Sequence, residues 1–118
     1  MIDILKPDFE HKDDRGKLTQ LVNHGYKQVN VIESKADMKR GGHYHKQNRE
    51  AFFIIRGTLD LILRIDGREE RHTFSEGDMF QIHEYVFHDF YFKTDTILVS
   101  MYDNGVELEN GEKDIYTI

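Results

Sequence analysis

The sequence predicts an all-β fold, either a barrel or a sandwich of short strands, and three observations lead to this prediction. Extended runs rich in β-branched and aromatic residues alternate along the chain with short clusters of Asp, Asn and Gly. No segment carries an apolar stripe with helical spacing over three turns. The pair Asp66-Gly67 separates two extended runs and is typical of a type I′ hairpin turn.

The first strand candidates lie in the N-terminal third of the chain. Residues 13–17 (DDRGK) are typical of a turn, and residues 18–22 (LTQLV) follow as a short strand. In residues 26–34 (YKQVNVIES), successive side chains of a strand alternate, so Val29 and Val31 share one face.

The longest extended run covers residues 50–65 (EAFFIIRGTLDLILRI). Its β-branched and aromatic content favours strand over helix, and Gly57 indicates a bend or bulge within it. Residues 75–78 (SEGD) form the next turn, before the extended run 79–92 (MFQIHEYVFHDFYF). A last strand is expected at 97–102 (ILVSMY).

Composition limits the possible functions. The chain has 118 residues, which suits one domain spanning residues 1–118. It contains no cysteine, so disulfides and thiolate ligands are excluded. A net charge of −6 argues against a nucleic-acid partner, because such binding neutralises phosphates with Lys and Arg. No apolar run approaches the ~20 residues of a membrane span, and the N-terminus is acidic, unlike a signal peptide. We therefore expect a cytoplasmic protein with no membrane partner.

A candidate site lies in residues 40–57 (RGGHYHKQNREAFFIIRG). His43 and His45 are two residues apart, so on an extended strand both side chains face the same side. Glu50 opens the next strand, and His88 lies on a later one. Three imidazoles and one carboxylate suit Zn, Fe, Mn, Ni or Co, and the spacing does not choose among them. The same residues also suit acid–base chemistry.

This segment resembles the first sequence motif of the cupin family, G-x5-HxH-x3,4-E-x6-G. His43, His45, Glu50 and Gly57 occupy the motif positions, and Asp37 replaces the leading glycine.

A later segment resembles the second cupin motif, G-x5-PxG-x2-H-x3-N. Gly77 and His88 match it, whereas His83, Tyr85 and Phe92 stand at its Pro, Gly and Asn positions.

The cupin resemblance covers residues 26–102 and implies a double-stranded β-helix, or jelly-roll barrel. It also implies one divalent transition metal, bound by His43, His45, Glu50 and His88.

A narrower resemblance concerns cupins that modify nucleotide sugars. Residues 13–21 (DDRGKLTQL) resemble their D-x-R-G-x-[LF] segment, and residues 39–46 (KRGGHYHK) are similar to a stretch of the sugar-nucleotide 3,4-ketoisomerases. Residues 29–57 are also similar to the C-terminal cupin domain of capsule-forming nucleotide-sugar epimerase/reductases, which binds zinc. The ketoisomerases usually carry an aromatic residue near Asn30 and a glutamine at the position of Glu50, so this chain is closer to the metal-binding branch.

The resemblance implies an isomerase or epimerase that acts on a keto nucleotide sugar in surface-polysaccharide biosynthesis. If His43 and His45 bind a metal, their ring nitrogens are not free to take a proton, and we assign the acid–base work to His83 and Tyr85. Tyr44 or a metal-bound water is an alternative. Without a metal, His43 or His45 would take the proton next to the ketone.

A nucleotide sugar also needs groups that bind it. Arg40 and Lys46 flank the candidate ligands and are the cations expected to contact the diphosphate. We assign Asn30 and Tyr102 to substrate binding as well, because Tyr102 can stack on a base or sugar.

Other expectations concern assembly and alternatives. Outward aromatic residues, including Phe53 and Tyr91, suit a homodimer interface, and the acidic segment 106–114 (VELENGEKD) is expected to be solvated. Two other functions use the same barrel: a non-catalytic cupin that binds a small sugar or acid, and an iron-dependent oxygenase-like cupin.

Overall fold

The structure, a computed structural model, describes all residues from 1 to 118. It contains eleven strands and no helix, so the all-β prediction is confirmed. Accordingly, it has no helical segment that could cross a membrane. The strands are β1 (Ile2–Leu5), β2 (Phe9–Asp13), β3 (Gly16–Gln20), β4 (Gln28–Ser34), β5 (Lys39–His43), β6 (Glu50–Arg56), β7 (Thr58–Ile65), β8 (Arg68–Ser75), β9 (Met79–Ile82), β10 (Phe87–Phe92) and β11 (Thr96–Tyr102).

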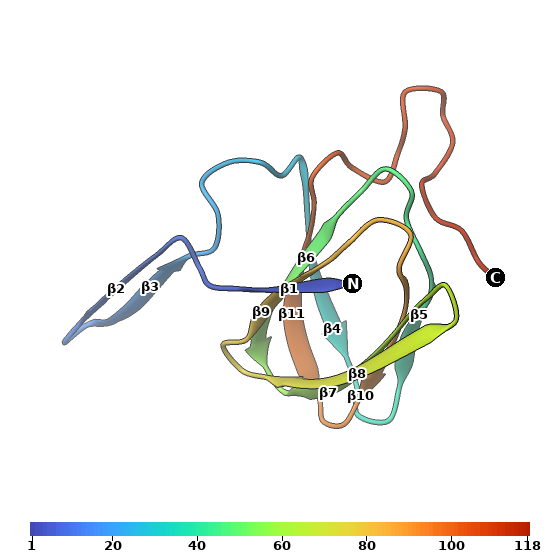
Figure 1. The fold of residues 1–118 in the computed structure, drawn as a ribbon. Coiled ribbons are helices and arrows are strands. Elements are labelled where there is room, and N and C mark those ends of the chain that lie inside the picture. The colour runs from blue at the N-terminus through green and yellow to red at the C-terminus, as the bar shows by residue number, and fades with distance from the viewer.

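Two antiparallel sheets face each other and form a jelly-roll barrel. The five-stranded sheet has the order β1-β9-β6-β11-β4, and the four-stranded sheet has the order β5-β10-β7-β8. From β4 to β11 each strand lies in the other sheet from the strand before it, except that β7 and β8 form a hairpin in the four-stranded sheet, so the chain crosses repeatedly between the two sheets (Figure 1). This is the double-stranded β-helix that the sequence resemblance implies.

The core lies between the two sheets and follows from side-chain alternation. In β7, Leu59, Leu61 and Leu63 are buried, whereas the residues between them are only partly buried. Each fully buried leucine stabilises the fold by about 1.5–3 kcal/mol through the apolar surface it removes from water. The main cluster consists of Phe52, Ile54, Leu59, Leu61, Leu63, Phe74, Phe80, Ile82, Val86, Phe90, Phe92 and Leu98.

Two predicted turns are confirmed by the backbone. The extended run 50–65 divides at Gly57, which has a φ of 107° and lies where the chain passes from β6 to β7. A Cβ there would lie 2.4 Å from Thr96 Oγ1, so only glycine fits this corner. Asp66 and Gly67 have φ values of 50° and 76°, and a type I′ turn requires positive φ at both central residues.

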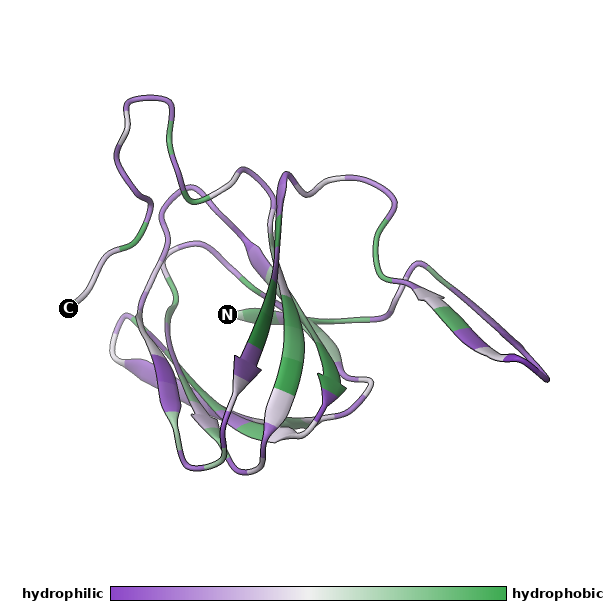
Figure 2. Cartoon of the chain, turned by 180° about the vertical axis from the view of Figure 1, so that it is seen from behind, coloured by the Kyte–Doolittle hydropathy of each residue, from purple (hydrophilic) through white to green (hydrophobic).

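The hairpin of β2 and β3 projects away from the barrel, as both views show (Figure 1 and Figure 2). The sequence predicts β3 in part but neither β1 nor β2. Phe9 and Leu18 on this hairpin are more than half exposed. A two-stranded hairpin alone is marginally stable in water, so we expect this hairpin to be less stable than the barrel.

Candidate functional site

The four predicted metal ligands come together at one end of the barrel. His43 ends β5, Glu50 begins β6, and His45 lies in the loop between these strands. His88 lies in β10, which pairs with β5 in a register that places His88 directly opposite His43. Strand pairing thus brings the two cupin-like motifs into contact.

A β-bulge in β5 sets the direction of His43. His88 pairs with His43, but Asp89 pairs with Gly41, so Gly42 is the extra residue of the bulge. Gly41 and Gly42 have φ values of 100° and 76°. A Cβ on Gly41 would lie 2.6 Å from the carbonyl oxygen of His88, so the two glycines before the histidines are a requirement of the site.

The candidate ligand atoms are close together and mostly buried. One nitrogen or oxygen atom from each of His43, His45, Glu50 and His88 lies within 4.8 Å of the others. Glu50 Oε1 is 3.1 Å from Nε2 of His45 and 3.7 Å from Nε2 of His88. His43 is partly buried, and the other three are buried.

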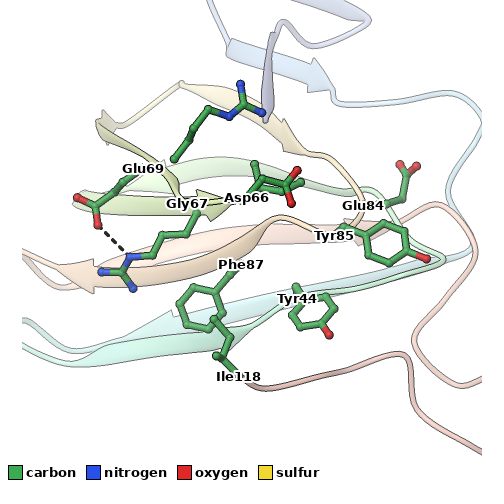
Figure 3. A pocket seen from close by; sticks show the side chains of 11 residues that line it. Tyr44, Asp66, Gly67, Glu69, Glu84, Tyr85, Phe87 and Ile118 are labelled. Atoms are coloured by element: carbon green, nitrogen blue, oxygen red, sulfur yellow. Dashed lines mark hydrogen bonds and ion pairs between the residues drawn. The ribbon is translucent and has the colours of Figure 1, made fainter.

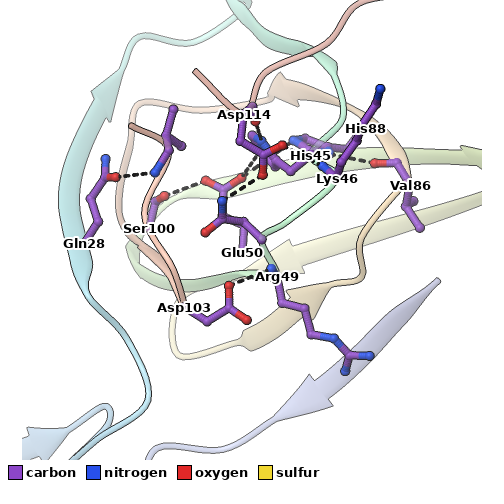
Figure 4. Close-up of polar contacts among 12 residues, drawn as sticks. Gln28, His45, Lys46, Arg49, Glu50, Val86, His88, Ser100, Asp103 and Asp114 are labelled. Atoms are coloured by element: carbon purple, nitrogen blue, oxygen red, sulfur yellow. Dashed lines mark hydrogen bonds and ion pairs between the residues drawn. The ribbon is translucent and has the colours of Figure 1, made fainter. Parts of the chain in front are cut away.

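Backbone carbonyls orient two of the imidazoles (Figure 4). Nδ1 of His45 is 2.6 Å from the carbonyl oxygen of Asp114, and Nδ1 of His88 is 3.0 Å from that of Val86. A carbonyl only accepts, so each Nδ1 donates its proton, and in a neutral ring the lone pair then lies on Nε2. Both Nε2 atoms face Glu50.

These contacts test whether a metal fits. Nε2 of His88 is buried and has no hydrogen-bond partner, which is costly for a polar atom. An unprotonated Nε2 of His45 and the Glu50 carboxylate would repel each other through their lone pairs. Either Nε2 therefore carries a proton, which makes the ring positively charged, or a metal cation lies between the two groups. Imidazoles held through Nδ1 by backbone carbonyls are typical of metal ligands. The residues therefore fit a divalent transition metal.

Burial and mutual contacts change the pKa values in the cluster. Burial lowers the pKa of His88 to about 4 and also lowers the pKa of His43, so both rings are neutral at pH 7. Burial alone would lower the pKa of His45 and raise that of Glu50, but their hydrogen bond and attraction prevail. The pKa of His45 is therefore raised and that of Glu50 lowered.

The cluster adjoins a cavity of about 140 Å³ inside the barrel. Residues from β4 and β5, the edge strands of the two sheets, line its walls, and several core side chains make them apolar. A small apolar cavity with converging polar groups is typical of a small-molecule site. Its lining is Ile32, Arg40, Gly41, His43, Glu50, Phe52, His88, Phe90, Phe92, Leu98 and Tyr102.

Two of the four residues assigned to substrate binding line this cavity. They are Arg40, whose Nε donates to Ser34 Oγ at 2.7 Å, and Tyr102. Asn30 lies on β4 opposite Ser100 but does not line the cavity. The Lys46 ammonium lies 4.2 Å from the centre of the Tyr116 ring, and Lys46 also lies outside the cavity.

The structure does not bring His83 and Tyr85 to the cavity. The extended run 79–92 divides into β9 and β10, and both residues lie in the turn between them. Nε2 of His83 is 2.9 Å from Asp3 Oδ2. Tyr85 lies with Tyr44 and Phe87 in a separate, open cavity of about 810 Å³ (Figure 3).

The backbone explains where the chain departs from the cupin motifs. Asp37 and Tyr85 stand at glycine positions of the motifs, and both have a positive φ, of 68° and 66°. Gly57 and Gly77, the glycines that the chain keeps, have φ values of 107° and 86°. All four positions therefore have the positive φ that glycine adopts most readily.

Sequence reasoning missed two polar partners of the cluster. Ser100 Oγ donates to Glu50 Oε2 at 2.6 Å, and both residues are buried. Asp114 is fully buried and Val106 is also buried, so the expectation that segment 106–114 is solvated is wrong at these two residues. No local pattern marks either residue, because their partners lie far away in the sequence.

The jelly-roll barrel and its three histidines and glutamate define a cupin. Residues 11–106 match a family described as polysaccharide biosynthesis C-terminal domain, and the chain belongs to this family. Among curated protein sequences, none matches the chain.

Solved structures with the same fold include nucleotide-sugar isomerases and epimerases. A TDP-quinovose 3,4-ketoisomerase from Campylobacter jejuni is 20% identical, with a TM-score of 0.79 over 96% of this chain and 92% of that one. A sugar 3,4-ketoisomerase from Thermoanaerobacterium thermosaccharolyticum, in complex with TDP, is 20% identical, with a TM-score of 0.76 over 86% of this chain and 80% of that one. A dTDP-4-dehydrorhamnose 3,5-epimerase from Sulfolobus tokodaii is 20% identical, with a TM-score of 0.73 over 86% of this chain and 69% of that one.

Proposed function

We propose that residues 1–118 form one cupin domain that isomerises or epimerises a keto nucleotide sugar for polysaccharide biosynthesis. We further propose that His43, His45, Glu50 and His88 bind a divalent metal. The observation that carries this proposal is the convergence of two buried imidazole Nε2 atoms on Glu50, beside an apolar cavity. The family match and the isomerases and epimerases of the same fold support the substrate class.

Substrate binding is assigned to the residues that line the cavity. The sugar ring occupies the apolar space beside the cluster, and Arg40 on edge strand β5 contacts the diphosphate. A complex of one structural neighbour with TDP-4-keto-6-deoxyglucose supports this class of ligand. Lys46 and Asn30 lie outside the cavity, so they can contact only those parts of the nucleotide that project from it.

Both candidate reactions remove a proton from a carbon next to a ketone, and negative charge then develops on the ketone oxygen. A bound divalent metal would stabilise that charge as a Lewis acid. Tyr102 lines the cavity, and burial together with the Glu50 carboxylate raises the pKa of its phenol. Tyr102 therefore keeps its proton at neutral pH and can donate a hydrogen bond to the ketone oxygen.

The residue that takes the proton depends on whether a metal is bound. In the metal-free protein, His43 is the least buried ring of the cluster and lines the cavity, and its lowered pKa keeps it neutral. It can then act as a general base. We assign no proton transfer to His83 or Tyr85, because neither lines this cavity.

Metal content tests the first part of the proposal. Elemental analysis of the untagged protein should find about one transition metal per chain, and the His45→Ala variant should lose it. Absence of metal after reconstitution with Zn²⁺, Co²⁺, Mn²⁺ and Fe²⁺ would overturn the metal centre and assign His43 to acid–base catalysis.

Proton exchange tests the second part. With TDP-4-keto-6-deoxyglucose in D₂O, the protein should incorporate deuterium next to the ketone, as seen by NMR, and Tyr102→Phe should slow conversion to product. Failure to exchange with TDP-linked and UDP-linked keto sugars would contradict an isomerase or epimerase and favour a binding protein.

We also infer a homodimer formed through the outer face of the five-stranded sheet. Val29 and Val31 on β4 are 60% and 67% exposed, and Phe53 and Ile55 on β6 point to the same side. An exposed apolar face on an edge strand favours a self-complementary contact. Tyr91 instead faces outward on the other sheet, where its hydroxyl donates to Asp37.

Light scattering should therefore give the mass of two chains, and Val31→Glu should give one. A monomeric wild-type protein at micromolar concentration would contradict this inference.

A further inference from the structure

The C-terminal segment beyond β11 contains a buried charge that the proposed chemistry does not use. Asp114 lies in a polar, glycine-containing stretch with no strand, yet it is 0% exposed. A buried carboxylate is costly unless hydrogen bonds compensate for the lost water. Its partners therefore indicate what the segment contacts.

The Asp114 carboxylate accepts three hydrogen bonds from one loop. Oδ1 accepts from the backbone N–H of Lys46 at 2.9 Å. Oδ2 accepts from the backbone N–H of Gln47 at 2.9 Å and from Nδ2 of Asn48 at 2.8 Å. These three residues directly follow His45, so the carboxylate fixes the chain that leaves this histidine (Figure 4).

The backbone of the same residue contacts the histidine ring itself. The carbonyl oxygen of Asp114 accepts from Nδ1 of His45 at 2.6 Å. This contact keeps a proton on Nδ1 and directs Nε2 toward Glu50. One residue thus fixes both the loop after His45 and the tautomer of its ring.

Neighbouring contacts keep Asp114 in place on both sides. The backbone N–H of Asp114 donates to the carbonyl of Val106 at 2.8 Å. Tyr116 and Tyr44 exchange two backbone hydrogen bonds, of 2.9 and 3.0 Å. The segment is therefore joined to Tyr44, just before His45, and to the loop just after it.

We propose that residues 106–118 form a strap that positions His45 for metal binding, with Asp114 as its anchor. The inference rests on the proposed metal centre, but the effect on the His45 tautomer does not require a metal. Asp114 is a positioning residue, since it contacts neither the cavity nor the candidate metal position. Loss of such an outer partner typically weakens metal affinity 10–100-fold.

Cobalt titration provides the first test, because the visible spectrum of Co²⁺ reports the geometry of its ligands. Wild-type protein should bind about one Co²⁺ per chain. Asp114→Ala should bind it roughly 10–100-fold more weakly and with an altered spectrum. Glu109→Ala, in an exposed part of the same strap, should match wild type in both respects. A folded Asp114→Ala variant with unchanged affinity and spectrum would overturn the proposal.

NMR of the histidine ring nitrogens in the metal-free protein provides the second test. In alkaline solution, where the ring is neutral, wild-type His45 should carry its proton on Nδ1, and Asp114→Ala should show a mixture of tautomers. If wild type binds no Co²⁺ but this change occurs, the metal centre fails and the strap survives. If Co²⁺ binds but the tautomer is unchanged, the strap fails alone.

A conservative variant covers the case in which Asp114→Ala does not fold. Asp114→Asn keeps the backbone carbonyl and one acceptor oxygen, so its cobalt affinity should lie between those of wild type and His45→Ala. Wild-type affinity and tautomer in a folded Asp114→Asn variant would contradict a role for the carboxylate.

Discussion

The two cupin motif segments contribute unequally to the site. Residues 37–57 supply three of the four cluster residues, whereas residues 77–92 supply only His88. In the second segment the departures from the motif, His83 and Tyr85, lie in a turn outside the cavity, while His88 is fixed by its pairing with His43. The comparison teaches that strand register preserves a ligand even where the adjoining turn has changed.

Breaking the register between the two segments should have the largest effect. Gly41→Ala would place a Cβ 2.6 Å from the backbone of His88, at a φ of 100°. We expect a loss of about 2–5 kcal/mol in the free energy of unfolding, from backbone strain plus the clash. Urea denaturation measures it.

Gly67→Ala is the matched control, because its φ is 76° but no atom lies within 4 Å of a Cβ there. It should lose only about 1–2 kcal/mol. Equal losses in the two variants would mean that the contact between the segments is not tight.

Protonation of His88 in acid should weaken the contact between the two motif segments. Its pKa is about 4 in the folded protein and about 6.5 when unfolded, so between these values the unfolded chain binds more protons. The free energy of unfolding of the metal-free protein should therefore decrease as the pH is lowered. His88 alone should account for a decrease of about 2 kcal/mol from pH 7 to pH 5. The lowered pKa of His43 acts in the same direction.

Urea denaturation in EDTA at several pH values measures this fall. His45, with its raised pKa, contributes stability that is present below pH 6.5 and lost as the pH rises, whereas the lowered pKa of Glu50 acts only below about pH 4.5. His88→Gln should reduce the slope between pH 7 and pH 5. An unchanged slope would assign the acid sensitivity to other groups.

The variant Ser100→Ala removes a hydrogen bond that Glu50, in the first segment, accepts from β11. The serine hydroxyl is a buried donor to Glu50 Oε2 at 2.6 Å. Hydrogen bonds to charged groups contribute about 1.5–3 kcal/mol, so we expect a loss near 1.5 kcal/mol and weaker Co²⁺ binding. Ser75→Ala, at an exposed serine, should change neither quantity. Wild-type Co²⁺ affinity in Ser100→Ala would mean that Glu50 does not need this donor.

The smallest effect is expected in the turn of the second segment. Tyr85→Gly should change stability by less than about 1 kcal/mol, because relief of strain at positive φ offsets the entropy of glycine and the lost ring contact with Tyr44. Tyr85→Val should lose about 1–2 kcal/mol, since a β-branched residue resists this conformation. Isomerase activity should persist in Tyr85→Gly, and its loss would return Tyr85 to the catalytic site.

Sequence reasoning succeeded where a short range of residues determines the outcome. Alternation along strands and the cupin spacing predicted His43, His45, Glu50 and His88 as one cluster, and the pair Asp66-Gly67 predicted its turn. It failed where partners are distant. Asp114 is 69 residues from His45 and Ser100 is 50 residues from Glu50, and only the paired sheets and the strap bring them together. The turn between β9 and β10, which directs Tyr85 outward, is also a property of the folded backbone.

The left-handed backbone at Asp37 and Tyr85 bears on how this family is recognised. A motif written in letters counts both positions as mismatches, although both have the positive φ that glycine favours. A comparison based on backbone handedness would count them as matches. Distant cupins that have exchanged glycine for other residues at these positions could therefore be found through their torsion angles after their letters have diverged.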